Sequence, residues 1–271
     1  MAPRAVRKST LTRPAPSGDG PKLTLWLNDL DDFTIRRVKQ LGVEHASMSG
    51  PALPWNEVEV RWRIERLASF GMKLSNMMFS GFPKAVYGSP GRDEDIEKVI
   101  KSIRVAGKLG LPVMEYNFYA HRAVEGYYDA PGRGGAALYA FDYDRIKDLP
   151  PLPDEGAHTL DEMWRNVTYF LKAVVPVAEK SGVRLALHPN DPPAPISRGS
   201  GQIMSTLAGW KRLLDIVPST SNGMTFDCGV TRELGEDPVE VCRYFGERDV
   251  INHMHFRNVK THVPNLKYTE V

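Results

Sequence analysis

Short apolar runs alternate with amphipathic helical segments seven times between residues 22 and 256. The runs have the length of buried strands, and apolar residues recur at helical spacing in the segments between them. Strands separated by helices pair in parallel, because each helix returns the chain to the same end of the sheet. The predicted strands are 22–27, 43–48, 72–79, 112–118, 183–188, 223–227 and 251–256.

Two architectures fit this alternation, a (β/α)8 TIM barrel and an open, doubly wound sheet. A nucleotide-binding open sheet carries a glycine-rich turn after its first strand, whereas WLNDLDD contains no glycine here. We therefore predict an α/β protein of the TIM-barrel type. A closed barrel needs an eighth strand, because an open edge leaves backbone groups unpaired. We expect LKYTEV, at the end of the sequence, to be a loop leading to an eighth unit beyond residue 271.

Two segments lie outside the barrel predicted over 22–271. Residues 1–21 contain four basic residues and no apolar stretch of a secretory signal, so we predict a flexible basic arm. Residues 119–157 are polar and rich in glycine, and loops of this length usually cover or line a site. We expect this insertion to act as a lid, with Gly132, Gly134 and Gly135 permitting its movement.

Composition narrows the choice of partners. The net charge of +2 gives no reason to expect binding to nucleic acid or to a membrane surface. Apolar runs stay shorter than the roughly 18–20 residues of a membrane span. Two cysteines, Cys228 and Cys242, suit a reducing cytoplasm better than a disulfide framework. We expect a cytoplasmic homo-oligomer, dimer or tetramer, that binds a small molecule.

Three side chains at the ends of successive predicted strands indicate a metal site. In α/β barrels the active site lies at the carboxyl ends of the strands, where His188, Asp227 and His255 are expected. Imidazole and carboxylate groups suit Mn²⁺, Co²⁺, Fe²⁺ or Zn²⁺. Because side chains alternate along a strand, His253 faces the same side as His255, one layer deeper.

Each candidate also has a structural interpretation when taken alone. A single histidine at a strand end is more often a hydrogen-bonded structural residue. Asp227 could cap the next turn, Glu115 could be a buried ion-pair partner, and Cys228 could be a small buried side chain. The convergence of two histidines and an aspartate on one point favours the metal.

The segments LALHPNDPP, GMTFDCG followed by ELGEDP, and HMHFRNV resemble the mannonate dehydratase family, within the xylose-isomerase-like superfamily of sugar isomerases and epimerases. EYNF fits as well, and the resemblance covers residues 22–271. It implies a divalent ion, commonly Mn²⁺, held by His, Cys, His and Asp. The two histidines correspond to His188 and His255. Aligning TFDCGVTRELG puts Asp227 at the family's cysteine position, as in sugar epimerases, and leaves Cys228 as an alternative ligand.

The resemblance implies the dehydration of D-mannonate to 2-keto-3-deoxy-gluconate. A divalent ion would stabilise the enediolate formed when the proton beside the carboxylate is removed. We predict that Arg257 binds the substrate carboxylate and that the substrate hydroxyls meet Asn117, His253 and Asn190. The catalytic acid and base are unassigned and are expected beyond residue 271, with a fourth, acidic ligand.

Other functions remain open. Asp227 also suits a metal-dependent sugar isomerase or epimerase, although such enzymes usually carry a carboxylate at the position of His188. A lyase acting on oxidised glycosides and a non-catalytic sugar-binding barrel are further alternatives. Mn²⁺ is the expected metal, with Co²⁺, Fe²⁺, Zn²⁺ and Mg²⁺ as alternatives.

Overall fold

The computed structural model describes residues 20–271, so the arm predicted at 1–21 lies almost entirely outside the described residues. These residues contain a seven-stranded parallel sheet in the order β1-β2-β3-β4-β7-β10-β11. Its strands are β1 (Thr24–Trp26), β2 (His45–Ser49), β3 (Lys73–Phe79), β4 (Val113–Tyr116), β7 (Arg184–Leu187), β10 (Asn222–Asp227) and β11 (Ile251–His255). Each overlaps a predicted strand, which confirms the α/β alternation.

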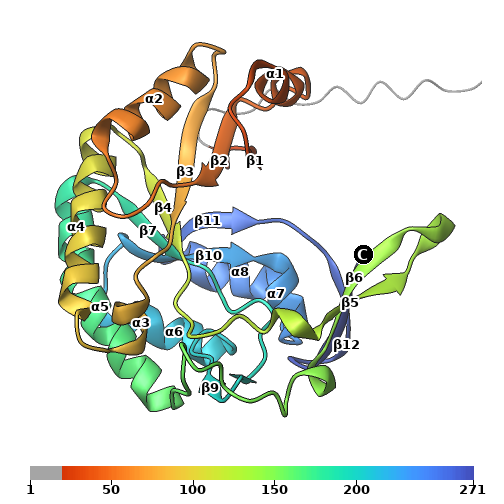
Figure 1. Ribbon diagram of the computed structural model, residues 1–271. Helices are drawn as coiled ribbons and strands as arrows, with labels where there is room; N and C mark the ends of the chain where they lie inside the picture. Colours follow the sequence, from red (N-terminus) through yellow and green to blue (C-terminus); the bar gives the residue numbers. More distant parts are fainter. Residues whose placement is uncertain (1–19) are drawn as a thin grey trace, which may run out of the picture.

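The sheet curls into part of a barrel, and α2, α4 and α5 follow its outside (Figure 1). The helices are α1 (Asp32–Gln40), α2 (Glu57–Ala68), α3 (Pro83–Tyr87), α4 (Arg92–Lys108), α5 (Leu160–Ser181), α6 (Leu207–Ile216), α7 (Cys228–Glu233) and α8 (Pro238–Gly246). Among the described helices, none combines the length and apolarity needed to cross a membrane.

Local signals in the sequence set where the helices begin. The Asp31 side chain accepts a hydrogen bond from the backbone N–H of Thr34 at the start of α1. Thr159 and Glu162 form a capping box at the start of α5, and Asp237 caps α8 immediately before its first residue, Pro238. These bonds satisfy backbone N–H groups that have no partner within a helix.

An aromatic cluster fixes α5 against the sheet. The Phe82 ring stacks on Phe170 of α5, with centroids 5.3 Å apart, and Phe79 stacks on Tyr116 at 5.1 Å. All four rings are buried in the main core. This packing holds the carboxyl ends of β3 and β4 rigid, next to the candidate site described below.

The two edges of the sheet, within residues 20–271, are β1 and β11. The outward-facing Phe256, just after β11, is 88% exposed. The eighth β/α unit expected beyond residue 271 stays a prediction.

The insertion at 119–157 is more regular than a long loop. It contains 3-10 turns at Val124–Gly126, Arg133–Gly135 and Tyr143–Arg145, and two antiparallel strands, β5 (Tyr127–Pro131) and β6 (Ala137–Asp142). The β5–β6 hairpin projects from the body of the molecule (Figure 1). Its turn carries Gly132, Gly134 and Gly135, so these glycines lie away from the curled sheet. The lid function of the insertion stays a prediction.

The expectation that LKYTEV is a loop is wrong. Strand β13 (Lys267–Glu270) pairs with both β12 (Val259–Val263) and β6, which completes a sheet in the order β12-β13-β6-β5. Tyr268 is fully buried and stacks on Phe141. One partner of β13, β12, is close in sequence, but the other, β6, lies more than 120 residues earlier, and that pairing could not be read from a local pattern. A short two-stranded sheet pairs β8 (Ile196–Ser197) with β9 (Ser200–Gly201).

Candidate active site

A cavity of about 220 Å³ opens at the carboxyl ends of the parallel strands. This is the end of the sheet where α/β barrels place their active sites. The residues that line it are Trp26, Met78, Glu115, Asn117, Tyr119, Arg122, His188, Pro189, Asp191 and His255. Pockets for drug-sized ligands start at roughly 300 Å³, so this smaller cavity suits a ligand below that size.

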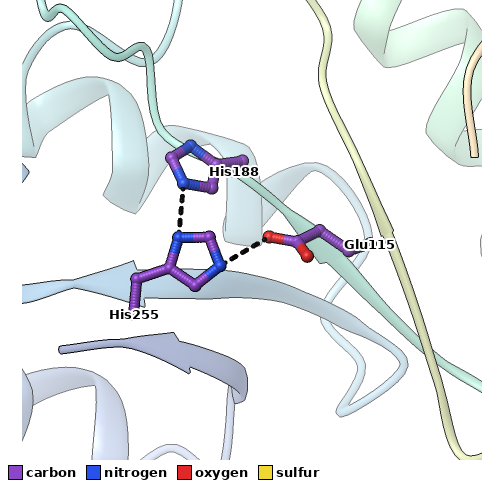
Figure 2. A group of neighbouring side chains, drawn as sticks. All are labelled: Glu115, His188 and His255. Atoms are coloured by element: carbon purple, nitrogen blue, oxygen red, sulfur yellow. Dashed lines mark hydrogen bonds and ion pairs between the residues drawn. The ribbon is translucent and has the colours of Figure 1, made fainter. Parts of the chain in front are cut away.

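The two predicted imidazoles meet in this cavity. His188 Nε2 lies 2.9 Å from His255 Nδ1 (Figure 2). His188 Nδ1 lies 2.7 Å from the carbonyl oxygen of Pro189. A carbonyl oxygen can only accept, so Nδ1 of His188 carries the proton and donates it. In that tautomer Nε2 carries the lone pair and faces His255 Nδ1 at 2.9 Å, and it is through such a nitrogen that an imidazole binds a metal.

Two carboxylates flank the imidazoles. Glu115 Oε1 lies 3.4 Å from His255 Nε2 (Figure 2), and Asp227 Oδ2 lies 3.6 Å from His255 Nδ1. Asp227 Oδ2 is also 3.9 Å from His188 Nε2. The structure thus brings together the predicted trio and adds Glu115. One ligand atom from each of Glu115, His188 and His255 fits within a span of 4.8 Å.

The spacing of these atoms suits one divalent ion. Nitrogen and oxygen ligands bind such ions at about 2.0–2.2 Å, which places neighbouring ligand atoms roughly 3.0–3.6 Å apart. His188 Nε2, His255 Nδ1 and Asp227 Oδ2 lie 2.9, 3.6 and 3.9 Å apart, close to that separation. The set with Glu115 is wider, up to 4.8 Å, and Glu115 faces the other ring nitrogen of His255. The donor chemistry, imidazole with carboxylate, fits a transition metal ion.

Glu115 was not predicted as a ligand, and the structure shows how it is held. Asn76 Nδ2 donates to Oε2 at 2.9 Å, and Thr225 Oγ1 donates to Oε1 at 2.8 Å. Burial raises the pKa of Glu115, but the charges of His188, His255 and His253 and the Thr225 bond outweigh it, so the pKa is lowered. The carboxylate is therefore ionised beside the imidazoles. The available sequence signal was a polar residue at an interior position of two other strands, Asn76 on β3 and Thr225 on β10.

Asp227 both caps a helix and faces the site. Its Oδ1 accepts from the backbone N–H of Val230 in α7 at 2.8 Å, as the capping interpretation expected. Both of its oxygens lie 3.2 Å from Nε of Arg257. Burial raises the pKa of Asp227, but His255, the charges of Arg257 and His188, and the Val230 N–H together lower it to about 2. A fixed negative charge results at neutral pH.

Arg257 is surrounded by carboxylates. Besides Asp227, its Nη1 lies 2.6 Å from Glu270 Oε1. Its Nη2 lies 3.0 Å from Asp191 Oδ1 and 2.9 Å from Glu233 Oε1. Arg257 does not line the cavity that holds the imidazoles. Its predicted role, binding a substrate carboxylate, would require an existing partner to leave.

The other predicted residues differ in their access to the cavity. Asn117 lines it. Asn190 is buried, with its amide donating to Gln202 and accepting from the Met204 N–H, so it supports the loop after β7. His253 packs edge-on to His255, with ring centroids 5.2 Å apart, and burial lowers its pKa.

Cys228 lies in a different hollow. It lines an apolar groove of about 810 Å³ together with Val239, Cys242, Met254 and Phe256. Asp227, rather than Cys228, therefore faces the imidazoles. This outcome follows from the turn into α7, where consecutive side chains point to opposite sides.

Comparison with known proteins assigns the chain to a family. Residues 155–271 match the model of the family described as D-mannonate dehydratase (UxuA). A mannonate dehydratase from Oceanobacillus iheyensis is 30% identical, and the match covers 87% of this chain and 75% of that protein.

Solved structures agree with the sequence match. The crystal structure of mannonate dehydratase from Streptococcus suis serotype 2 aligns with a TM-score of 0.83 at 25% identity, over 92% of this chain and 76% of that one. A 3-keto-D-glucoside 4-epimerase from E. coli aligns with a TM-score of 0.54 at 16% identity, over 83% of this chain and 73% of that one, and shares the fold alone. The curled sheet therefore has the fold of a mannonate dehydratase, and the chain belongs to the mannonate dehydratase family, whose reaction is that of a hydro-lyase.

Proposed function

We propose that this protein dehydrates D-mannonate to 2-keto-3-deoxy-gluconate with a divalent ion bound in the cavity. The observation that carries the proposal is the meeting of His188 and His255 with ionised carboxylates at the ends of β4, β7, β10 and β11. Membership of the mannonate dehydratase family supplies the substrate class.

Four side chains are candidates to hold the ion. His188 would bind through Nε2, because its Nδ1 is committed to Pro189. His255 and Asp227 complete the predicted set, with His255 binding through Nδ1. Glu115 offers the alternative carboxylate, for an ion bound at Nε2 of His255, because one imidazole gives a single nitrogen to an ion. When bound, a divalent ion stabilises negative charge that develops on a sugar acid as a proton leaves the carbon beside its carboxylate.

The protein itself would orient the substrate. Asn117 reaches the cavity and has both a donor and an acceptor for sugar hydroxyls. His253 lies behind His255 and would hold that ring in place. Asn190 was expected to contact a substrate hydroxyl directly. Its side chain instead bonds to Gln202 and Met204, so its proposed role is to support the loop that carries Asp191.

Metal analysis followed by turnover tests the proposal. The purified protein should contain, or take up, one divalent ion per chain, with Mn²⁺ as the expected metal. With that ion it should convert D-mannonate to a 2-keto-3-deoxy acid. A panel of other aldonates should react more slowly.

Replacing one imidazole gives a sharper test. His255→Ala should lose most of the bound metal, because it removes one proposed ligand and also the ring that contacts another, His188. His262→Ala is the matched control, since that histidine is exposed on β12 and bonds to Thr269. Full metal retention by His255→Ala would contradict the assignment.

A sugar epimerase is the second candidate. The two carboxylates beside the imidazoles, Glu115 and Asp227, favour it, because such enzymes move protons between carboxylates and sugar carbons. Ketoses in the substrate panel distinguish the two, since an epimerase would interconvert them without releasing water. Assembly as a homo-oligomer and a cytoplasmic location stay part of the proposal, and sedimentation measures the former.

A further inference from the structure

A sugar acid carries a carboxylate that the cavity must recognise. The proposed metal would share that task, but an anion in a hollow already containing Glu115 and Asp191 needs a cationic side chain as well. Among the described residues that line the cavity, Arg122 is the one with a permanent positive charge.

Arg122 is accessible and held in place. Its side chain is 46% exposed, so a ligand can reach it. Nε donates to the backbone oxygen of Asp191 at 2.6 Å, and Nη2 approaches Asp191 Oδ2 at 3.4 Å. A guanidinium has five N–H donors, so several remain for a bidentate contact with a carboxylate.

Asp191 is itself fixed from three sides. Its Oδ1 accepts from Tyr127 Oη at 2.9 Å, and Tyr127 in turn contacts Tyr268 Oη at 2.8 Å. Arg257 Nη2 lies 3.0 Å from the same oxygen. The insertion, the loop after β7 and the last strand therefore meet at one carboxylate, which holds the Arg122 head group at the cavity wall.

Arg122 and Arg257 differ in how far their charges are neutralised. Arg257 meets four carboxylates, two of them almost fully buried. Arg122 contacts the carboxylate of Asp191 and shares it with Arg257. The attraction for an incoming anion is consequently stronger at Arg122.

We propose that Arg122 binds the carboxylate of the sugar-acid substrate and that Asp191 positions Arg122 for this contact. The proposal rests on the proposed function, because it takes a sugar acid as the ligand. It assigns the insertion at 119–157 a direct part in substrate recognition and gives Arg257 a structural one.

Binding of a charged and a neutral ligand tests this assignment. D-mannonate and D-mannitol differ in the carboxylate, and calorimetry on the metal-loaded full chain measures the affinity for each. Arg122→Ala should weaken mannonate binding by about 10- to 100-fold, the usual effect of losing charge-assisted hydrogen bonds. Mannitol binding and metal content should stay within roughly two-fold of the wild-type values.

Two further variants distinguish the loss of a substrate contact from a general disturbance of the structure. Arg122→Lys keeps the charge without the paired donors and should recover part of the affinity. Arg133→Ala removes an exposed arginine from the hairpin turn and should bind both ligands as the wild-type protein does. Equal weakening of mannonate and mannitol in both Arg122 variants would overturn the proposal, because it would indicate a structural role.

The outcomes separate this proposal from the proposed function. If the wild-type protein dehydrates mannonate and Arg122→Ala binds it unchanged, the role of Arg122 is wrong while the function stands. If the wild-type protein prefers aldonates through Arg122 but dehydrates none, the reaction is wrong and the recognition stands. Absence of any preference for mannonate over mannitol in the wild-type protein would also reject the role of Arg122.

Discussion

Replacing Arg257 by methionine should destabilise the fold and make its stability strongly pH-dependent. The guanidinium lies 2.6–3.2 Å from carboxylate oxygens of Asp191, Asp227, Glu233 and Glu270. Asp227 and Glu233 are 1% and 0% exposed. Methionine keeps much of the volume but leaves these carboxylates without their shared cation.

The expected magnitude follows from burial. Removing one partner of a buried ion pair typically costs about 3–5 kcal/mol, because the remaining charge is left uncompensated. The Glu270 contact adds little, because that side chain is 34% exposed and partly screened by solvent. We therefore expect a loss of about 3–5 kcal/mol in the free energy of unfolding at pH 7.5.

The sign of the pH dependence follows from the carboxyl pKa values. In the native protein the pKa of Asp227 is about 2, so its contribution to stability is present above about pH 4 and is lost as the pH falls toward 2. Burial and nearby Asp191 raise the pKa of Glu233, and burial raises that of Glu270. Without Arg257 all of these pKa values rise, so the folded variant binds more protons than the unfolded chain. Its stability should then fall as the pH rises above about 4.5.

Urea unfolding in EDTA at pH 5 and pH 7.5 measures the effect. The difference in the free energy of unfolding between the wild-type protein and Arg257→Met should be about 1–2 kcal/mol smaller at pH 5 than at pH 7.5. One extra proton bound by the folded variant changes its stability by about 1.4 kcal/mol per pH unit. Arg243→Met is the matched control, because Arg243 and Glu240 are 66% and 69% exposed, and it should change stability by less than about 0.5 kcal/mol. A deficit below about 1 kcal/mol, or one equal at both pH values, would refute this reasoning.

Two further predictions concern the support of the site and the core. Asn76→Ala removes the donor to Glu115 Oε2 and should lower metal affinity by about 10- to 100-fold in chelator competition. An unchanged affinity would show that the Asn76 bond does not support metal binding through Glu115. Trp210→Ala should cost about 3–5 kcal/mol in urea unfolding, because the ring is fully buried and its Nε1 donates to the Met204 oxygen. Trp62→Ala, at a 55% exposed position, should cost far less, and equal losses would contradict the burial argument.

The order of strands and helices was predictable because its signals are local. Apolar runs, capping residues such as Thr159 with Glu162, and glycines after helices report on backbone conformation within a few residues. The insertion and the last strand were not predictable in this way. Strand β13 pairs with the neighbouring β12, but its other edge pairs with β6 and Tyr268 packs on Phe141, and these two contacts join distant parts of the chain.

The sequence by itself determined the fold class and the place of His188, Asp227 and His255 at the carboxyl ends of parallel strands. Only the tertiary structure decided how these side chains are partnered. It placed Glu115 beside His255, turned Cys228 away from the imidazoles and surrounded Arg257 with carboxylates. Backbone periodicity is fixed by near neighbours in the chain. The partner of a charged side chain depends on which elements the curled sheet brings within a few ångströms, and sequence spacing does not encode that distance.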